Sequence, residues 1–157
     1  MKTHVTFLTA LIAGVIAIGS TSALADDDGG GKIVISTPLA PAAIGPYSQA
    51  IRVGKTVYLS GQIAIDPTTN QFMTGASIED QTRRVLENLA GVLTAAGLRL
   101  DDVVNTTVYL ADLTDFAKMN QVYATFFKNA PPARATIQVV AIPRNAKVEI
   151  SAIAVAP

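Results

Sequence analysis

The segment PPARATIQVVAIPRNAKVEISAIAV, residues 131–155, contains two runs with the composition of β-strands. Residues 135–140 and 147–155 are rich in β-branched side chains, and a proline-containing turn joins them. Arg134 stands at the mouth of the first run and Glu149 lies inside the second. Because an unpaired charge is costly to bury, these two charged residues need an explanation beyond the packing of strands.

Upstream of this segment, the sequence predicts four more strands and two helices. The first helix is expected to begin at Ser77, which forms a capping pair with Asp80, and Gly97 is well placed to end it. The second helix spans residues 116–128 and carries an apolar stripe typical of a core-facing surface. The four additional strands are expected at residues 32–36, 50–53, 56–60 and 103–110.

The order β-β-β-α-β-α-β-β favours an α+β fold with one mixed sheet and two helices packed on one face. Two helices are too few to cover both faces of such a sheet, so the other face would stay bare in a monomer. An exposed apolar sheet face usually indicates a surface that a partner covers. The pattern therefore predicts an assembly of subunits.

The first 25 residues predict a secretory signal peptide. MKTH provides a basic start, residues 5–18 are apolar, and Ala23 and Ala25 offer small residues to a signal peptidase. The alternative, a membrane-anchoring helix, is disfavoured because the apolar run is shorter than the roughly 20 residues that a span requires. We expect residues 26–31, DDDGGG, to form a flexible acidic linker and residues 32–157 to form one domain. The expected location is outside the cytosol, in a bacterial periplasm, with no membrane attachment after cleavage.

Composition excludes several classes of active site. The chain has no cysteine, and its single histidine, His4, would leave with the signal peptide. Cys–His and Ser–His–Asp sites are thereby ruled out, as are zinc sites built on thiolate or imidazole ligands. With 12 basic and 12 acidic side chains, the chain has no basic excess to bind nucleic acid. We expect neither a metal nor a cofactor, and any catalysis must use the remaining polar groups and water.

The candidate functional residues can be read in two ways. The planar guanidinium of Arg134 is suited to a carboxylate ligand, but the same residue could instead form a surface salt bridge, with Glu149 as a candidate partner. Tyr47 could line a site or be a half-buried packing residue, and Ser60–Gly61 could be a strand-end turn. Asn120, on the second predicted helix, completes the set. The residues by themselves leave these alternatives open.

Three stretches resemble one family closely. They are PAAIGPYSQAIRVGKTVYLSGQI (41–63), NLAGVLTAAGLRLDDVVNTTVYLADLTDFAKMNQVY (88–123) and PPARATIQVVAIPRNAKVEISAIA (131–154). They are similar to the Rid family (YjgF, reactive intermediate/imine deaminase A). The resemblance covers residues 33–156, and its most specific part is P-A-R followed by V-E-I across an I-P turn. The amino-terminal segment and its linker are additions, since most family members are cytosolic.

The resemblance implies a chorismate-mutase-like fold assembled as a homotrimer, with the sheets packed inward and sites in clefts between subunits. Active members hydrolyse 2-imino acids to 2-oxo acids and ammonia. By position, Arg134 matches the arginine that holds the substrate carboxylate, and Glu149 matches the carboxylate that positions the attacking water. Thr136 stands where the family often has cysteine, a change that bears on pocket shape and substrate range. The remaining pocket positions are Tyr47, Ser60, Gly61 and Asn120.

The chemistry of an imine is compatible with this residue set. A protonated imine carbon is already electrophilic, so its hydrolysis needs no covalent nucleophile and no metal. It needs groups that bind the substrate, position a water molecule and accept a proton, and a chain without histidine or cysteine can supply all of these. The alternative from another class is a non-catalytic trimer that binds small carboxylates or acts as a chaperone. Ribonuclease activity, also associated with relatives, is disfavoured by the near-neutral charge and missing histidine.

We predict that the exported protein begins at Asp26, because the residues before it follow the pattern of a cleaved signal peptide. Amino-terminal sequencing of the soluble exported fraction should read DDDGGG. A membrane-retained protein that starts at Met1 would contradict this expectation.

Overall fold

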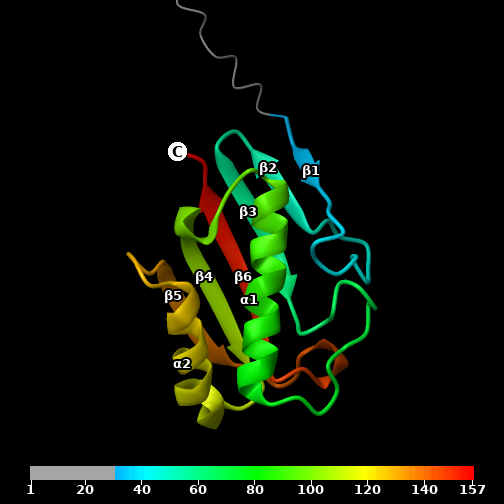
Figure 1. Cartoon of the computed structure of the whole chain (residues 1–157), viewed down its shortest axis with the longest axis vertical. Helices are drawn as coiled ribbons and strands as arrows, with labels where there is room; N and C mark the ends of the chain where they lie inside the picture. Colours follow the sequence, from blue (N-terminus) through cyan, green and yellow to red (C-terminus); the bar gives the residue numbers. More distant parts are fainter. Residues whose placement is uncertain (1–30) are drawn as a thin grey trace, which may run out of the picture.

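The computed structural model describes residues 31–157, and its elements follow the predicted order (Figure 1). The predicted signal peptide and nearly all of the predicted linker lie outside the described residues. The elements are β1 (Ile33–Ile35), β2 (Ala50–Val53), β3 (Thr56–Gln62), α1 (Ile78–Ala95), β4 (Val103–Leu110), α2 (Phe116–Phe126), β5 (Ala133–Gln138) and β6 (Val148–Val155).

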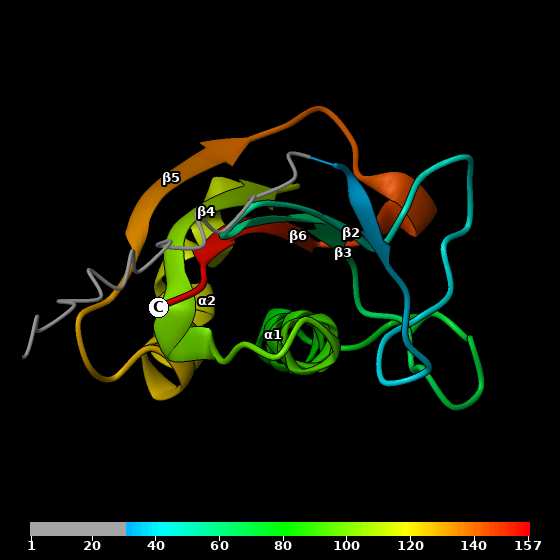
Figure 2. The same ribbon diagram turned by 90° about the horizontal axis from the view of Figure 1, so that it is seen from above.

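The strands form one six-stranded mixed sheet in the order β1-β2-β3-β6-β4-β5. All neighbours pair antiparallel except β4 and β5, which are parallel and are joined through α2. Both helices lie on the same side of the curved sheet (Figure 2). The predicted α+β architecture, with one mixed sheet and two helices on one face, is confirmed.

Two strand boundaries differ from the prediction and change the setting of candidate residues. β5 begins at Ala133 instead of residue 135, because it pairs with β4 along the length from Asn105 to Leu110. Arg134 therefore lies inside the strand and not at its mouth. β3 continues to Gln62 through a register shift against β6, so Ser60 and Gly61 lie within an irregular strand and not in a turn after it.

The ends of α1 follow from local chemistry. The Ser77 hydroxyl accepts a hydrogen bond from the Asp80 backbone N–H at 3.1 Å, as the capping pair predicts. Beyond the last turn, Gly97 adopts φ +73°, a left-handed conformation that costs glycine little.

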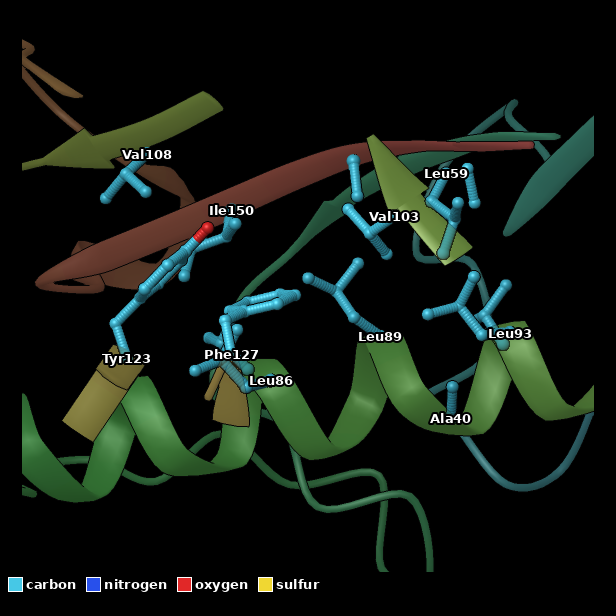
Figure 3. Close-up of a cluster of buried hydrophobic side chains, with 14 of the residues drawn as sticks. Ala40, Leu59, Leu86, Leu89, Leu93, Val103, Val108, Tyr123, Phe127 and Ile150 are labelled. Atoms are coloured by element: carbon cyan, nitrogen blue, oxygen red, sulfur yellow. The ribbon is translucent and has the colours of Figure 1, made fainter. Parts of the chain in front are cut away.

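The core lies between the sheet and α1, and strand β6 is its centre. Val148, Ile150, Ala152 and Ala154 alternate along β6 and are all buried. α1 packs a stripe that includes Leu86, Leu89 and Leu93 against this side of the sheet, as Figure 3 shows. At roughly 1.5–3 kcal/mol for each large apolar side chain, this burial is the main contribution to stability.

The opposite face of the sheet is apolar and uncovered in the single chain. Its exposed side chains include Val34, Val53, Tyr58, Ile137 and Val155, and strand register places Val34, Ile51 and Tyr58 side by side across three strands. The predicted bare face is therefore present. Across residues 31–157, no helix has the length and apolarity needed to cross a membrane.

Gly91 in the interior of α1 is explained by a close backbone approach. The loop after β1 crosses the helix at this point, and a Cβ on Gly91 would overlap the carbonyl oxygen of Leu39. The loop that carries Tyr47 thus rests on a helix surface that only glycine leaves open.

We expect Gly91→Ala to destabilise the protein, although alanine is favoured over glycine in a helix by about 1 kcal/mol. The added methyl group collides with backbone, and such overpacking costs about 1–3 kcal/mol. Denaturant unfolding measures the difference. An increase in stability would show that the loop moves aside freely.

Candidate active site

Strand alternation places Arg134 and Glu149 on opposite faces of the sheet. Arg134 pairs with Thr106 of β4, which pairs in turn with Ala152, and both partners are buried beneath the helices. Glu149 lies between the buried residues Val148 and Ile150, so its side chain points to the uncovered face. The two candidate residues therefore do not meet within one chain.

The salt-bridge interpretation of Arg134 and Glu149 is wrong for the single chain. Among residues 31–157, the structure contains one ion pair, Arg84–Glu87, at 3.0 Å on the surface of α1. Sheet geometry is the reason, because residues of opposite parity in register cannot share a face.

Glu149 lines a recess of about 270 Å³ at the edge of the uncovered face. A Cβ on Gly61 would overlap the Glu149 carboxylate, so the glycine makes room for this acid. The structure thus brings together four of the predicted site residues. The recess is lined by Ile44, Tyr47, Ser60, Gly61, Ile63, Pro143 and Glu149.

Partial burial raises the pKa of the Glu149 carboxyl above its ordinary value, and no neighbouring cation or hydrogen bond counteracts the effect. A carboxylate with a raised pKa is a stronger base than an ordinary glutamate. This is the property expected of a proton acceptor.

A buried glutamine fixes the loop that forms one wall of the recess. The Gln49 side chain accepts a hydrogen bond from the Thr37 backbone N–H at 2.6 Å and donates to the carbonyl of Pro41 at 2.7 Å. Ser60 ties the same loop to β3, because its hydroxyl donates to the carbonyl of Ser48 at 2.7 Å. Tyr47 is thereby held at the recess, although the residue as a whole stays 45% exposed.

Arg134 lines a second recess, of about 440 Å³, between β5 and α2. The guanidinium carbon lies 4.6 Å from the ring centre of Tyr123 and 5.9 Å from that of Phe116. The other residues that line this recess are Asn120, Tyr123, Ala124, Phe127, Pro131 and Pro132. Two of the predicted residues, Arg134 and Asn120, are therefore neighbours.

Thr136 belongs to the Arg134 side of the sheet. It is two residues further along β5 and pairs with the buried Val108 of β4. Its hydroxyl is buried without a hydrogen-bond partner in the part of the chain that the structure describes. Such a group is satisfied only by a ligand, a water or a second chain.

Part of this arrangement was not predicted. Tyr123 belongs to the apolar stripe of the helix predicted at residues 116–128, and the structure places it both in the core and beneath Arg134. Gln49 and the apolar walls Ile44, Ile63 and Pro143 were missed altogether. In the described part of the chain, no three acidic, histidine or cysteine side chains gather as a metal site would require.

Comparison with known proteins identifies close relatives. Residues 37–156 match the family model described as endoribonuclease L-PSP. The mouse protein named 2-iminobutanoate/2-iminopropanoate deaminase is 52% identical over 122 residues, which are 78% of this chain and 90% of that protein.

Two solved structures share the fold. RidA from an Antarctic Psychrobacter is 45% identical, with a TM-score of 0.75 over 78% of this chain and 98% of that chain. E. coli TdcF with bound serine is 42% identical, with a TM-score of 0.76 over 80% of this chain and 99% of that chain.

We predict that Glu149→Gln raises the free energy of unfolding at pH 8, because the neutral amide avoids the cost of burying a charge. The folded state binds the Glu149 proton more tightly than the unfolded state does, so the wild type regains stability as pH falls through the raised pKa. The advantage of the variant should shrink accordingly between pH 8 and pH 5. Urea unfolding at both pH values measures it.

Glu87→Gln is the matched control, because Glu87 is exposed and paired with Arg84. This change should leave stability at pH 8 unchanged or slightly lower. A Glu149→Gln protein less stable than wild type at pH 8 would contradict the assignment of a buried, unpaired carboxylate.

Proposed function

The chain belongs to the endoribonuclease L-PSP family, and from this membership we propose that it is a hydrolytic deaminase that converts 2-imino acids to 2-oxo acids and ammonia. Relatives of about half-identical sequence bear the name 2-iminobutanoate/2-iminopropanoate deaminase. Arg134 holds the substrate carboxylate and Glu149 positions and deprotonates the attacking water. The other residues assigned to the substrate pocket are Tyr47, Ser60, Gly61, Asn120 and Thr136.

The observation that carries this proposal is the state of Glu149. Its carboxylate lies against Gly61 in a recess with mainly apolar walls, without an ion-pair partner among residues 31–157 and with a pKa raised by burial. Acidic side chains are seldom withdrawn from water without a partner. This is the environment expected of a general base.

The reaction balances with these groups. Water attacks the carbon of the protonated imine, a C–O bond forms, and Glu149 accepts one water proton. The resulting carbinolamine carries a neutral amino group. Glu149 returns its proton to that nitrogen, the C–N bond breaks, and the hydroxyl proton leaves with ammonia as the C=O bond forms. Arg134 stays bound to the carboxylate throughout and fixes the carbon relative to the water.

A complete site requires two chains, because one chain holds Arg134 and Glu149 on opposite faces of its sheet. A homotrimer with the uncovered faces turned inward would place the Glu149 recess of one subunit against the Arg134 recess of the next. The exposed apolar face supports such an assembly, since side chains such as Tyr58 and Ile137 are then removed from water.

A second candidate is a trimer that binds small carboxylates without turning them over. The solved structure of TdcF contains bound serine, which carries a carboxylate but no imine. This candidate shares the Arg134 contact and has no role for the base. Binding and turnover therefore have to be measured separately. The compartment proposed for either activity remains the periplasm.

At substrate concentrations below KM, we expect Arg134→Ala and Glu149→Gln each to remove most of the turnover, and an equimolar mixture of the two to regain it after the subunits are exchanged. The loss of a charge-assisted contact at Arg134 is worth about 2–5 kcal/mol, or roughly 30- to 5000-fold. Random mixing restores about a quarter of the composite sites. Ammonia release, with imines generated in situ by an amino-acid oxidase, is the measurement.

Light scattering of each variant checks that the assembly persists, and thermal melts check folding. Arg134→Lys should also turn over poorly, because an ammonium lacks the two-pronged contact. Activity that stays absent in the exchanged mixture would contradict a site shared between chains. Full turnover in a folded Arg134→Ala assembly would exclude the clamp, and wild-type binding of 2-oxobutanoate without turnover would favour the second candidate.

A further inference from the structure

Arg134 rests on an aromatic surface supplied by α2. The guanidinium carbon lies 4.6 Å from the ring centre of Tyr123, which is only 5% exposed, and 5.9 Å from that of Phe116, which is 40% exposed. A guanidinium attracted to an aromatic ring is restrained at a site where a solvated arginine would sample many rotamers. Tyr123 is the nearer and the more rigidly buried of the two rings.

The position of Tyr123 is itself fixed by a buried hydrogen bond. Its hydroxyl lies 2.7 Å from the Thr106 hydroxyl, and Thr106 is fully buried in β4. Figure 3 shows the Tyr123 side chain rising from α2 with its oxygen toward the sheet. Ring packing against Phe127, with centres 4.6 Å apart, adds a second restraint.

These contacts link Thr106 to Arg134 in two ways. Thr106 is also the β4 residue paired with Arg134 in the strand register. One threonine thus joins the Arg134 backbone through the sheet and the Arg134 guanidinium through the Tyr123 ring. Because the hydroxyl lies on the long axis of the ring, any movement that tilts this axis away from Arg134 would have to break the buried Thr106 bond.

We infer that Tyr123 is a positioning residue, which acts with Thr106 to hold the Arg134 guanidinium in the orientation that receives a substrate carboxylate. The inference rests on the proposed function and adds to it a restraint built from the core. A phenylalanine would fill the same volume without a hydroxyl to bury. The tyrosine hydroxyl adds the hydrogen bond to Thr106, which fixes the far end of the ring against β4.

The solution state of Tyr123 agrees with this role. Burial raises the pKa of its hydroxyl above the ordinary value, and the Thr106 bond and the Arg134 charge oppose the shift only in part. The hydroxyl therefore stays protonated at neutral pH and remains a hydrogen-bond partner for Thr106.

Binding of 2-oxobutanoate, measured by calorimetry, tests the inference without requiring turnover. Tyr123→Leu removes the ring and should weaken binding by about 5- to 30-fold, the range of a partly desolvated cation–π contact. Tyr123→Phe keeps the ring, loses the restraint, and should weaken binding by about 2- to 10-fold. In turnover, both should raise KM with little change in kcat, because Arg134 contacts the carboxylate in ground and transition states alike.

Val122→Ala is the matched control. Val122 is buried on the same helix and supplies no ring beneath Arg134. Its truncation should therefore lower stability and leave binding unchanged. In an Arg134→Ala background, Tyr123→Leu should have no further effect on binding, since the tyrosine acts through the arginine. A merely structural tyrosine would give the same loss in both backgrounds.

A ligand-independent measurement separates this inference from the proposed function. The Arg134 Nε–H group should have a high NMR order parameter in the wild type and a much lower one in Tyr123→Leu. A wild type that neither binds 2-oxobutanoate nor releases ammonia would overturn the proposed function, and the NMR comparison would still decide on the restraint. Unchanged Arg134 order together with binding within twofold of wild type in both Tyr123 variants would overturn the inference.

Discussion

The alternation of strand β6 is the constraint on which the rest of the structure depends. Val148, Ile150, Ala152 and Ala154 must face α1, because their burial makes the core. Glu149 is therefore forced to the other face, and a slip of one residue would bury it and expose the core set. The same rule, carried across β4 by register, assigns Arg134 to the helix side. The strand register that builds the core therefore also determines on which face each candidate residue lies.

The two recesses make different use of that framework. Around Glu149, the protein leaves a carboxylate short of partners, and Gly61 and the Gln49-braced loop keep the space around it open. Around Arg134, it does the reverse: the exposed charged group rests on aromatic rings, and a buried hydrogen bond holds the nearer ring. A base is useful when its environment raises its pKa, whereas a clamp is useful when its geometry is restrained.

Much of the fold could be predicted from local patterns, and the differences have specific causes. Ser77 and Gly97 marked the ends of α1 because capping chemistry depends on neighbouring residues alone. The start of β5 was misjudged because Ala133 joins the sheet only through its partner Asn105, which local composition does not show.

For the site, Arg134 and Glu149 were visible as charges in apolar surroundings. Family resemblance, not spacing, assigned them and the other pocket residues their roles. No local sequence pattern indicated the role of Gln49, because that role depends on hydrogen bonds to carbonyl groups within residues 37–41, which only the folded loop brings close. The contact of Tyr123 with Arg134 could not be predicted, because an apolar stripe indicates burial but not which side chain packs against each of its rings.

The central place of β6 also bears on how the chain acquires its structure. The last strand in sequence is inserted between β3 and β4, and it is the sole bridge between the β1–β3 and β4–β5 portions of the sheet. Until residues 148–155 arrive, a growing chain holds two separate partial sheets with open hydrogen-bonding edges. Its longest-range pairings form last, which is the order that slows folding and exposes nascent chains to aggregation. A polypeptide shortened by this one strand would lose the connection between its halves, and it would lose Glu149 together with the strand that carries it.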